Sequence, residues 1–278
     1  MLTSILPCAS VDVPSLTSLR TRIAALCSRA HVPYSGDPVA AGVLLSDGDW
    51  IPGVRVESAS FSLTLPAVVN AYTTAVALGR AEDVVAVAAS RPLRPEDDLY
   101  LAGIGPSAED AAWETPAAQI RTRCAPDALP DTLGRPVSPS WKAPITSVAE
   151  GIDEVRRVAE RAHVPASSFP VGALLHCAPD VYVPGVNVEH PDWTRILCAE
   201  RNAIGTAQSY GLDGATRLLL TCLRDAGGTP CGACRQWIAE LTPAATLWMD
   251  RHDQPPASSP ISALLPGSFQ GHALLPES

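Results

Sequence analysis

The sequence predicts an α/β fold made of two tandem copies of one domain, each a sheet covered by helices on both faces. Two observations carry this prediction: a long repeat that keeps one spacing, and an alternation of strand-like and helix-like segments within each copy. The chain has 278 residues, of which 46% are hydrophobic and 18% charged, so it can build two hydrophobic cores.

The repeat has an offset of 132 residues. RAHVP occurs at residues 29–33 and again at 161–165. Without a gap, the same offset aligns IPGVRVE (51–57) with VPGVNVE (183–189), and LPAVVNAYTTA (65–75) with LCAERNAIGTA (197–207). Between residues 29–79 and 161–211, 21 of 51 aligned positions are identical. Register kept over that length indicates a duplicated and fused domain.

A proline-rich stretch separates the copies. Seven prolines fall within residues 106–146, and prolines at that density do not continue helices or central strands. The predicted organisation is therefore a first domain at 1–105, a linker at 106–146 and a second domain at 147–278. Within the linker, residues 108–124 are compatible with a short helix.

Each copy is expected to open with an amphipathic helix. One face carries Leu16, Leu19, Ile23 and Leu26 in the first copy and Val148, Ile152, Val155 and Ala159 in the second. The second copy then predicts strands at 171–177 and 181–188, a helix from Cys198 to Tyr210 stopped by Gly211, a strand at 217–223, a helix at 231–241 and a strand at 246–249. The first copy follows this course through a strand at 84–90 and then loses the parallel.

Charge and composition exclude several classes of protein. A net charge of −9 argues against a nucleic-acid partner, because phosphate backbones attract the opposite sign. No apolar run approaches a membrane span, and the N-terminus has no signal-peptide pattern. We therefore expect a cytoplasmic protein whose eight cysteines are thiols or metal ligands.

Three cysteines and one glutamate are placed where zinc chemistry could use them. Cys231 and Cys234 form a CxxC at a predicted helix N-terminus, and Cys198 begins another helix. Helix N-termini favour thiolates, and three thiolates can hold one Zn²⁺ while the fourth tetrahedral position stays open to water. Glu200, two residues after Cys198, can reach that water as a proton carrier without being a ligand.

The residues alone leave alternatives open. Three thiolates carry excess negative charge, and Arg201 is the candidate to compensate it. A CxxC can also be redox-active or belong to a closed structural zinc site, for which Cys222 or Cys177 could supply the fourth ligand.

The combination of CAERNA and PCGACRQ, preceded by FPVGALL and GVNVE, resembles the cytidine deaminases of free nucleosides. The resemblance covers most of residues 147–278 and, more weakly, 29–79. It implies a three-layer αβα fold with a mixed central sheet. It also implies that Cys198, Cys231 and Cys234 bind zinc, and that Glu200 shuttles protons while a zinc-bound hydroxide attacks C4 of cytosine and ammonia leaves.

The same resemblance implies substrate contacts. Asn187 and Glu189 would bind the ribose hydroxyls, Phe169 would pack on the base, and the Ala199 backbone would contact the pyrimidine. Phe269 would close the active site of a neighbouring domain. The structural alternatives are a polar strand end for Asn187 and Glu189, a core aromatic for Phe169, and a tail packed on its own core for Phe269.

Four residues depart from the family pattern near the expected pocket: Ala166, His190, Trp193 and Ile196. These departures concern the substrate preference and not the type of reaction. The motifs predict the deamination of cytidine or 2′-deoxycytidine in pyrimidine salvage. The alternatives are the same chemistry on another aminopyrimidine nucleoside, of the blasticidin S type, and a zinc-stabilised binding protein without catalysis.

The first copy cannot build this zinc site. Pro66 and Val68 stand where Cys198 and Glu200 stand in the second copy, and Arg55 replaces Asn187. We therefore expect one zinc per chain, in the second copy, with the first copy retained for assembly. The predicted assembly is a homodimer of two-domain chains.

Overall fold

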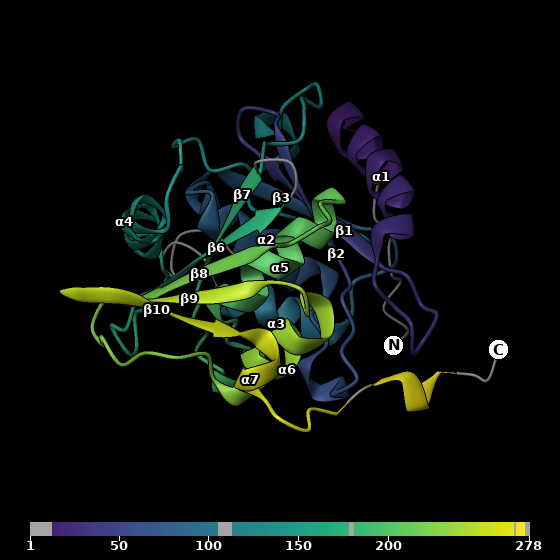
Figure 1. Cartoon of the computed structure of the whole chain (residues 1–278). Helices are drawn as coiled ribbons and strands as arrows, with labels where there is room; N and C mark the ends of the chain where they lie inside the picture. Colours follow the sequence, from purple (N-terminus) through teal and green to yellow (C-terminus); the bar gives the residue numbers. More distant parts are fainter. Residues whose placement is uncertain (1–12, 105–112, 178–180, 270, 276–278) are drawn as a thin grey trace.

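The computed structural model describes residues 13–104, 113–177, 181–269 and 271–275, which form two five-stranded sheets with flanking helices (Figure 1). The first unit, 13–122, contains α1 (Pro14–Leu26), β1 (Ala40–Leu45), β2 (Trp50–Val54), α2 (Ala67–Ala77), β3 (Val84–Ala89), α3 (Pro95–Gly103), β4 (Glu114–Ala117) and β5 (Ile120–Thr122). The second unit, 147–275, contains α4 (Val148–Ala159), β6 (Val171–Cys177), β7 (Val181–Val186), α5 (Ala199–Tyr210), β8 (Arg217–Cys222), α6 (Gly232–Leu241), β9 (Thr246–Arg251), β10 (Gln254–Pro260) and α7 (Ile261–Leu264).

Each unit has three layers, as the sequence predicts. In the second unit, Gly172 of β6 faces α4, because a Cβ there would lie 2.6 Å from the Val155 carbonyl oxygen. Gly185 of β7 faces α5 on the other side of the sheet: its Cβ would lie 2.3 Å from the Ala199 carbonyl oxygen. The repeated Pro-Gly-Val of both copies thus lets a helix approach an edge strand closely. In the first unit, Gly53 has the same close contact with α2.

The two sheets differ in their last strands. The second sheet, in the order β10-β9-β8-β6-β7, is mixed, because β9 runs parallel to β8 and the other neighbours are antiparallel. The first sheet, in the order β2-β1-β3-β5-β4, is antiparallel throughout its described pairs. In the first unit two strands follow α3, and the second of them, β5, lies inside the sheet. In the second unit two strands follow α6, and the first of them, β9, lies inside the sheet. The sequence predicts that the correspondence between the two copies ends after β3, and this difference in strand order is where it ends.

The first unit extends beyond the predicted boundary at residue 105. Strands β4 and β5 lie within the stretch assigned to the linker and complete the first sheet. Pro116 is compatible with β4 because β4 is an edge strand, where a missing N–H costs no ladder bond. The described part of 108–124 is therefore strand and not helix; residues 108–112 lie outside the described residues.

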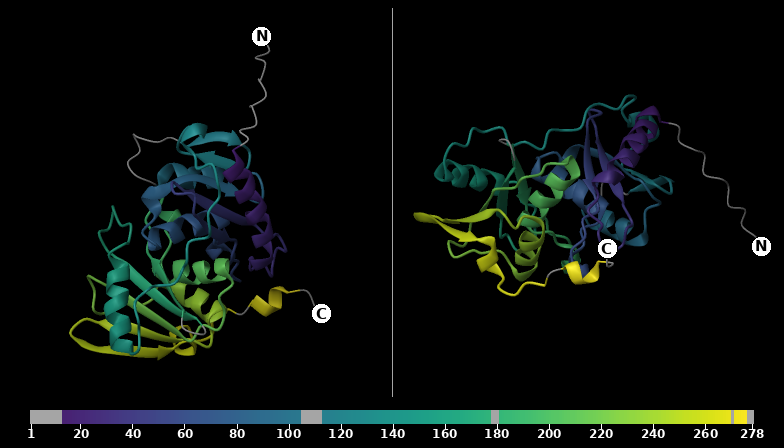
Figure 2. Two further views of the ribbon diagram at one scale, coloured as in Figure 1. Left: turned by 90° about the horizontal axis from the view of Figure 1, so that it is seen from above. Right: turned by 45° about the vertical axis from the view of Figure 1, so that its right-hand side comes forward.

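The remainder of the linker runs along exposed sheet edges. The Val137 N–H donates to the Trp50 carbonyl of β2, and the Trp141 N–H donates to the Tyr182 carbonyl of β7. Figure 2 shows the linker (teal) passing from one unit to the other. It covers backbone groups that edge strands would otherwise present to another chain. No helix among the described residues has the length and apolar character needed to cross a membrane.

Helices α2 and α5 pack against each other in an arrangement that repeats the 132-residue offset. The Asn70 amide donates to the Gly205 carbonyl (3.0 Å), and its counterpart Asn202 donates to the Thr73 hydroxyl (3.1 Å). The Thr74 and Thr206 hydroxyls, also counterparts, are 2.8 Å apart. The two halves thus form an internal pseudo-dimer with a buried polar seam.

The ends of this seam are closed by the arginines of the repeated RAHVP. Arg29 donates to the Ser209 carbonyl and Arg161 to the Ala77 carbonyl, each over 3.0 Å. These four residues are pairwise counterparts at the 132-residue offset. The repeat therefore contributes directly to the contact between the units.

Candidate active site

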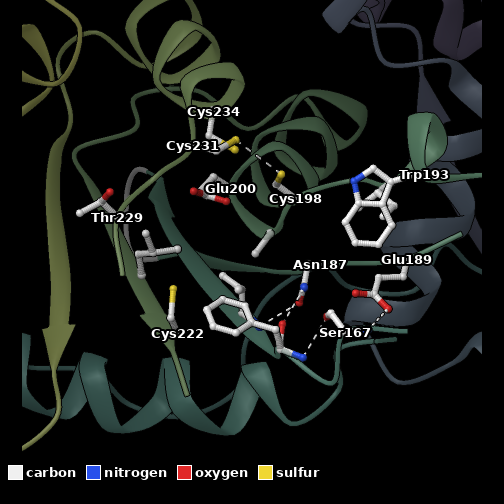
Figure 3. A pocket seen from close by; sticks show the side chains of 15 residues that line it. Ser167, Asn187, Glu189, Trp193, Cys198, Glu200, Cys222, Thr229, Cys231 and Cys234 are labelled. Carbon is white, nitrogen blue, oxygen red and sulfur yellow. Dashed lines mark hydrogen bonds between the residues drawn. The ribbon is translucent and has the colours of Figure 1, made fainter. Parts of the chain in front are cut away.

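Three cysteine sulfurs converge where the N-termini of α5 and α6 meet (Figure 3). Cys198 and Cys231 are the N-cap residues of these helices, and Cys234 lies in the first turn of α6. The three Sγ atoms lie within 4.8 Å of one another, and those of Cys198 and Cys231 are 3.9 Å apart. Tetrahedral zinc with Zn–S bonds near 2.3 Å separates its sulfurs by about 3.8 Å, so the cluster fits one Zn²⁺.

Among the described residues, this cluster contains three potential ligands and no fourth. Neither Cys222 nor Cys177, the candidates for a closed structural site, joins it. The geometry therefore leaves one tetrahedral position open, as a catalytic zinc site requires.

Electrostatics at the cluster favour negative charge on Cys231. Its thiol pKa is lowered, first by hydrogen bonds from the Cys198 and Cys234 thiols and then by the backbone N–H groups of α6. The pKa of Cys198 is raised first by its hydrogen bond to Cys231, and that of Cys234 first by its hydrogen bonds to Cys198 and Cys231. A bound dication would favour the thiolate form of all three cysteines.

Glu200 occupies the first turn of α5 with 3% of its surface exposed, close to the sulfurs (Figure 3). Burial first, and then the nearby Cys231 thiolate, raise the pKa of its carboxyl to about 7. A dication at the cluster would act in the opposite direction, because it favours the carboxylate. A carboxyl group poised in this way can take up and release a proton near neutral pH.

The cluster forms one wall of a pocket of about 330 Å³, within the range of small-molecule sites. The pocket contains most of the residues that the resemblance assigned to the site. Its other lining residues are Ser167, Phe169, Val171, Asn187, Glu189, Trp193, Ile196, Ala199, Leu220, Cys222 and Thr229, all from the second unit.

Asn187 and Glu189 line the pocket, but both also hold the backbone. The Asn187 amide donates to the Phe169 carbonyl and accepts from the Val171 N–H, which ties the pocket loop to β7. Glu189 accepts the N–H groups of Ala166 and Ser167, both at Oε2. The Ser167 side chain first, and then these two bonds, lower the pKa of Glu189 despite its burial. Their ribose contacts stay predictions.

Two aromatic side chains stand at the pocket opening. Phe169 is 36% exposed and Trp193 is 68% exposed, so a bound ring would cover apolar surface that water now contacts. Ile196 also lines the pocket, whereas His190 is buried and stacks on Tyr100 of the first unit at 5.4 Å. Of the four departures from the family pattern, Trp193 and Ile196 thus lie in the pocket.

Arg201 and Phe269 lie outside the pocket lining. The Arg201 guanidinium donates to the Leu63 carbonyl of the first unit over 2.7 Å and lies 5.0 Å over the Trp237 ring. Phe269 is 52% exposed, and its carbonyl accepts from Gln236 of α6. Compensation of the thiolates by Arg201, and closure of a neighbouring site by Phe269, stay predictions.

Sequence reasoning did not assign Leu220, Cys222 and Thr229 to the pocket. Cys222 was considered only as a possible fourth zinc ligand, yet it lies across the pocket from the cluster (Figure 3). It ends β8, and the end of a strand that leads toward a helix N-terminus is the available signal for a pocket position.

The corresponding place in the first unit carries ion pairs. Arg55, the counterpart of Asn187, pairs with Asp37 and Glu57, each over 3.0 Å. Asp37 is the counterpart of Phe169, so the aromatic wall is also gone. In the part of the chain that the structure describes, the second unit holds the one group of metal-ligating side chains.

Residues 147–249 match the family model described as the cytidine and deoxycytidylate deaminase zinc-binding region. A cytidine deaminase of Sporosarcina psychrophila is 34% identical over 119 residues, which cover 42% of this chain and 88% of that protein. One of Halalkalibacterium halodurans is 35% identical over 119 residues, covering 42% and 90%. A solved cytidine deaminase structure from Burkholderia pseudomallei is 28% identical, covers 45% of this chain and all of that one, and gives a TM-score of 0.43.

A three-thiol cluster with an open position and a buried glutamate beside it defines a zinc-dependent hydrolase site. With relatives matched over most of their length, the chain belongs to the cytidine deaminase family. The predictions of this family and of zinc in the second half are confirmed.

Proposed function

We propose that the chain hydrolyses the 4-amino group of cytidine or 2′-deoxycytidine, giving the uracil nucleoside and ammonia, as a step of pyrimidine salvage. The observation that carries this proposal is the buried Glu200 carboxyl beside an open three-thiol cluster at the wall of a nucleoside-sized pocket. The relatives named cytidine deaminase support it further.

The second unit supplies groups for each part of this reaction. Cys198, Cys231 and Cys234 would hold Zn²⁺, which when bound supplies a Lewis acid that makes water nucleophilic. Glu200 would take the proton of the attacking water on its carboxylate and deliver it to the substrate, so that the amino group leaves as ammonia. Because Glu200 is buried, a substrate in the pocket would separate its proton from bulk water.

The pocket walls would orient the nucleoside. Phe169 and Trp193 offer apolar ring surface for the pyrimidine, and Glu189 offers a carboxylate oxygen for a ribose hydroxyl. Burial of a carboxyl group costs free energy. A zinc protein without catalysis would gain nothing from such a group beside an open zinc position, which favours the catalytic proposal.

Ammonia release by the zinc-loaded chain tests the reaction and its substrate together. The substrates to compare are cytidine, 2′-deoxycytidine, cytosine, CMP and blasticidin S. We expect turnover of the two nucleosides and little of free cytosine, which lacks the ribose. Turnover of blasticidin S alone would transfer the proposal to that substrate class, and no turnover of any of the five would refute it.

We further propose that the first unit holds the two zinc-bearing helices in place. The Leu63 carbonyl accepts from Arg201 of α5 and from the Trp237 indole of α6, over 2.7 and 3.1 Å. Glu240, also on α6, accepts from Tyr34 and Ser58 of the first unit. The Leu63 carbonyl thus contacts both zinc-bearing helices, and the Glu240 bonds hold the C-terminal end of α6. These contacts are a physical reason to retain a half without ligands.

A homodimer of two-unit chains is our proposed assembly. Exposed aromatic side chains support it, because their burial between two chains would be favourable: Phe61 is 87% exposed and Phe269 is 52% exposed. Sedimentation equilibrium of the purified chain tests this, and a monomer at all concentrations would refute it. We also propose a cytoplasmic location, because thiol ligands need a reducing compartment and the seven described cysteines are all free.

A further inference from the structure

A second cleft lies on the molecule away from the catalytic pocket, where the linker passes between the end of α2 and α4. We refer to it as the linker cleft; its main lining residues are Arg80, Ser138, Trp141, Lys142, Arg157 and Arg161. Its volume is about 470 Å³, compared with about 330 Å³ for the catalytic pocket. It is lined by both units and the linker, so a ligand there would touch all three parts of the chain.

The linker cleft concentrates positive charge in a chain with a net charge of −9. Four cationic side chains line it, among them Lys142, the only lysine in the sequence. One carboxylate, Glu154, also lines it, so the lining carries four positive charges and one negative. Arg80 is further paired with Asp47 and Asp83. No ion pair is formed by Lys142 or Arg161 with any described residue, which leaves both charges available to an anion.

Existing contacts hold part of the cleft wall in place. The Trp141 indole N–H donates to Glu154 over 3.0 Å, and Glu154 also pairs with Arg157. The Arg161 guanidinium lies 4.6 Å over the indole ring and donates to the Ala77 carbonyl. Side chains that are already ordered lose less conformational entropy when a ligand binds.

The positive charge is not a by-product of the duplication. At the 132-residue offset, Arg161 corresponds to Arg29, and both close the contact between the units. Arg80 and Arg157, however, correspond to Leu212 and Ala25, so the opposite side of the molecule lacks these cations. Arg29 and Arg161 hold the contact between the units. Arg80 and Arg157 have no cationic counterpart in the other copy, so the duplication does not account for them.

From this charge and geometry we propose that the linker cleft binds an anion that carries two or more phosphate groups. Guanidinium groups bind phosphate oxygens in a bidentate manner, an ammonium binds them as a point charge, and the Ser138 and Ser140 hydroxyls can donate as well. The cations come from three separate segments around a cavity larger than one phosphate group. A nucleoside triphosphate and a free oligophosphate share the chemistry that this arrangement recognises.

The test measures binding to the zinc-loaded full chain by calorimetry, at one fixed ionic strength, with tripolyphosphate and CTP as probes. We expect saturable binding of one tripolyphosphate per chain and a higher melting temperature in its presence. Lys142→Gln should weaken this binding about tenfold, the equivalent of one charge-assisted hydrogen bond. Lys142 is exposed, so the variant should fold normally. Arg22→Gln, an equal charge change at an exposed position on α1, is the matched control and should change the Kd less than twofold.

CTP distinguishes the two sources of phosphate. If CTP binds more tightly than tripolyphosphate, and Lys142→Gln weakens both, the ligand is a nucleotide; equal affinities with the same loss point to oligophosphate. CTP binding that Lys142→Gln leaves unchanged, together with no saturable tripolyphosphate binding, would overturn the proposal. An equal loss in Arg22→Gln would also overturn it, because the effect would then be general attraction to the protein's charge.

Discussion

Glu240 connects the first unit to the helix that carries two of the zinc ligands, and Glu240→Gln is the change that tests this connection. One carboxylate oxygen accepts from the Tyr34 hydroxyl over 2.9 Å and from the Ala59 N–H, and the other accepts from the Ser58 hydroxyl over 2.7 Å. All three donors belong to the first unit. Burial, and then the hydrogen bond to Glu240, raise the pKa of Tyr34 to about 12, so its hydroxyl stays a donor at physiological pH.

Glutamine keeps the size of Glu240 but removes its charge and turns one acceptor into a donor. A hydrogen bond to a charged group contributes about 1.5–3 kcal/mol to the stability of the fold, and a neutral one about 1 kcal/mol. In the glutamine variant, one of the three donors would also face an NH₂ group, which cannot accept its hydrogen bond. Because Glu240 is half-buried, we expect a loss of about 2–3 kcal/mol in the free energy of unfolding. Zinc should dissociate faster as well, because α6 carries Cys231 and Cys234.

The assay combines urea unfolding of the zinc-loaded chain with the rate of zinc transfer to a coloured chelator. The spectrum of the Co²⁺-substituted protein reports the geometry of the thiol cluster independently of activity. Glu160→Gln, an exposed carboxylate at the end of α4, is the matched control and should stay within about 0.5 kcal/mol of wild type. A double-mutant cycle with Tyr34→Phe isolates the hydroxyl bond. Wild-type stability and zinc release in Glu240→Gln would refute the idea that the first unit holds α6.

Three further outcomes are expected. Glu200→Gln should keep zinc and fold but lose about 10²–10⁴-fold in kcat, because glutamine cannot carry the proton; metal content and ammonia release measure both. The isolated segment 147–278 should aggregate or lose most activity, because the α5 surface that packs on α2 becomes exposed; light scattering and the deaminase rate measure this. Burial acts to raise the pKa of Asp250, but Arg156 and other hydrogen-bond donors lower it from 3.8 to about 2. The ionised Asp250 therefore stabilises the fold above pH 4. This contribution to the free energy of unfolding disappears as the pH falls toward 2. Asp250→Asn should therefore lose about 2 kcal/mol at pH 7 and show a smaller decline in stability between pH 4 and 2, measured by urea unfolding.

Each expectation has a result that contradicts it. Turnover within a few-fold of wild type in Glu200→Gln would exclude Glu200 as the proton carrier. A soluble, fully active monomer of 147–278 would show that the first unit is dispensable. Equal acid sensitivity of Asp250→Asn and wild type would mean that the ion pair with Arg156 does not set the stability in that range.

Local sequence was enough to predict the duplication and the course of the second unit, and together with the family resemblance it predicted the zinc ligands. Cys198 and Cys231 are N-cap residues, and the boundaries of α5 and α6 agree with the prediction within one residue. Helix periodicity, caps and the CxxC spacing are properties of neighbouring residues, so they can be read without the partners of the fold. The strand β10 was missed because its three prolines argue against a strand, although an edge strand tolerates them.

Tertiary structure alone decided what lies across the contact between the units. Arg201, expected beside the thiolates, donates to a carbonyl 138 positions away in the sequence. His190, expected near the substrate pocket, stacks on Tyr100 of the first unit. The Asn187 side-chain amide forms hydrogen bonds with the backbone of Phe169 and Val171. A flexible or polar side chain has several partners within reach, and the packed surroundings choose among them through burial and hydrogen bonding. The sequence determines which groups are available for chemistry, whereas long-range packing determines what each of them faces.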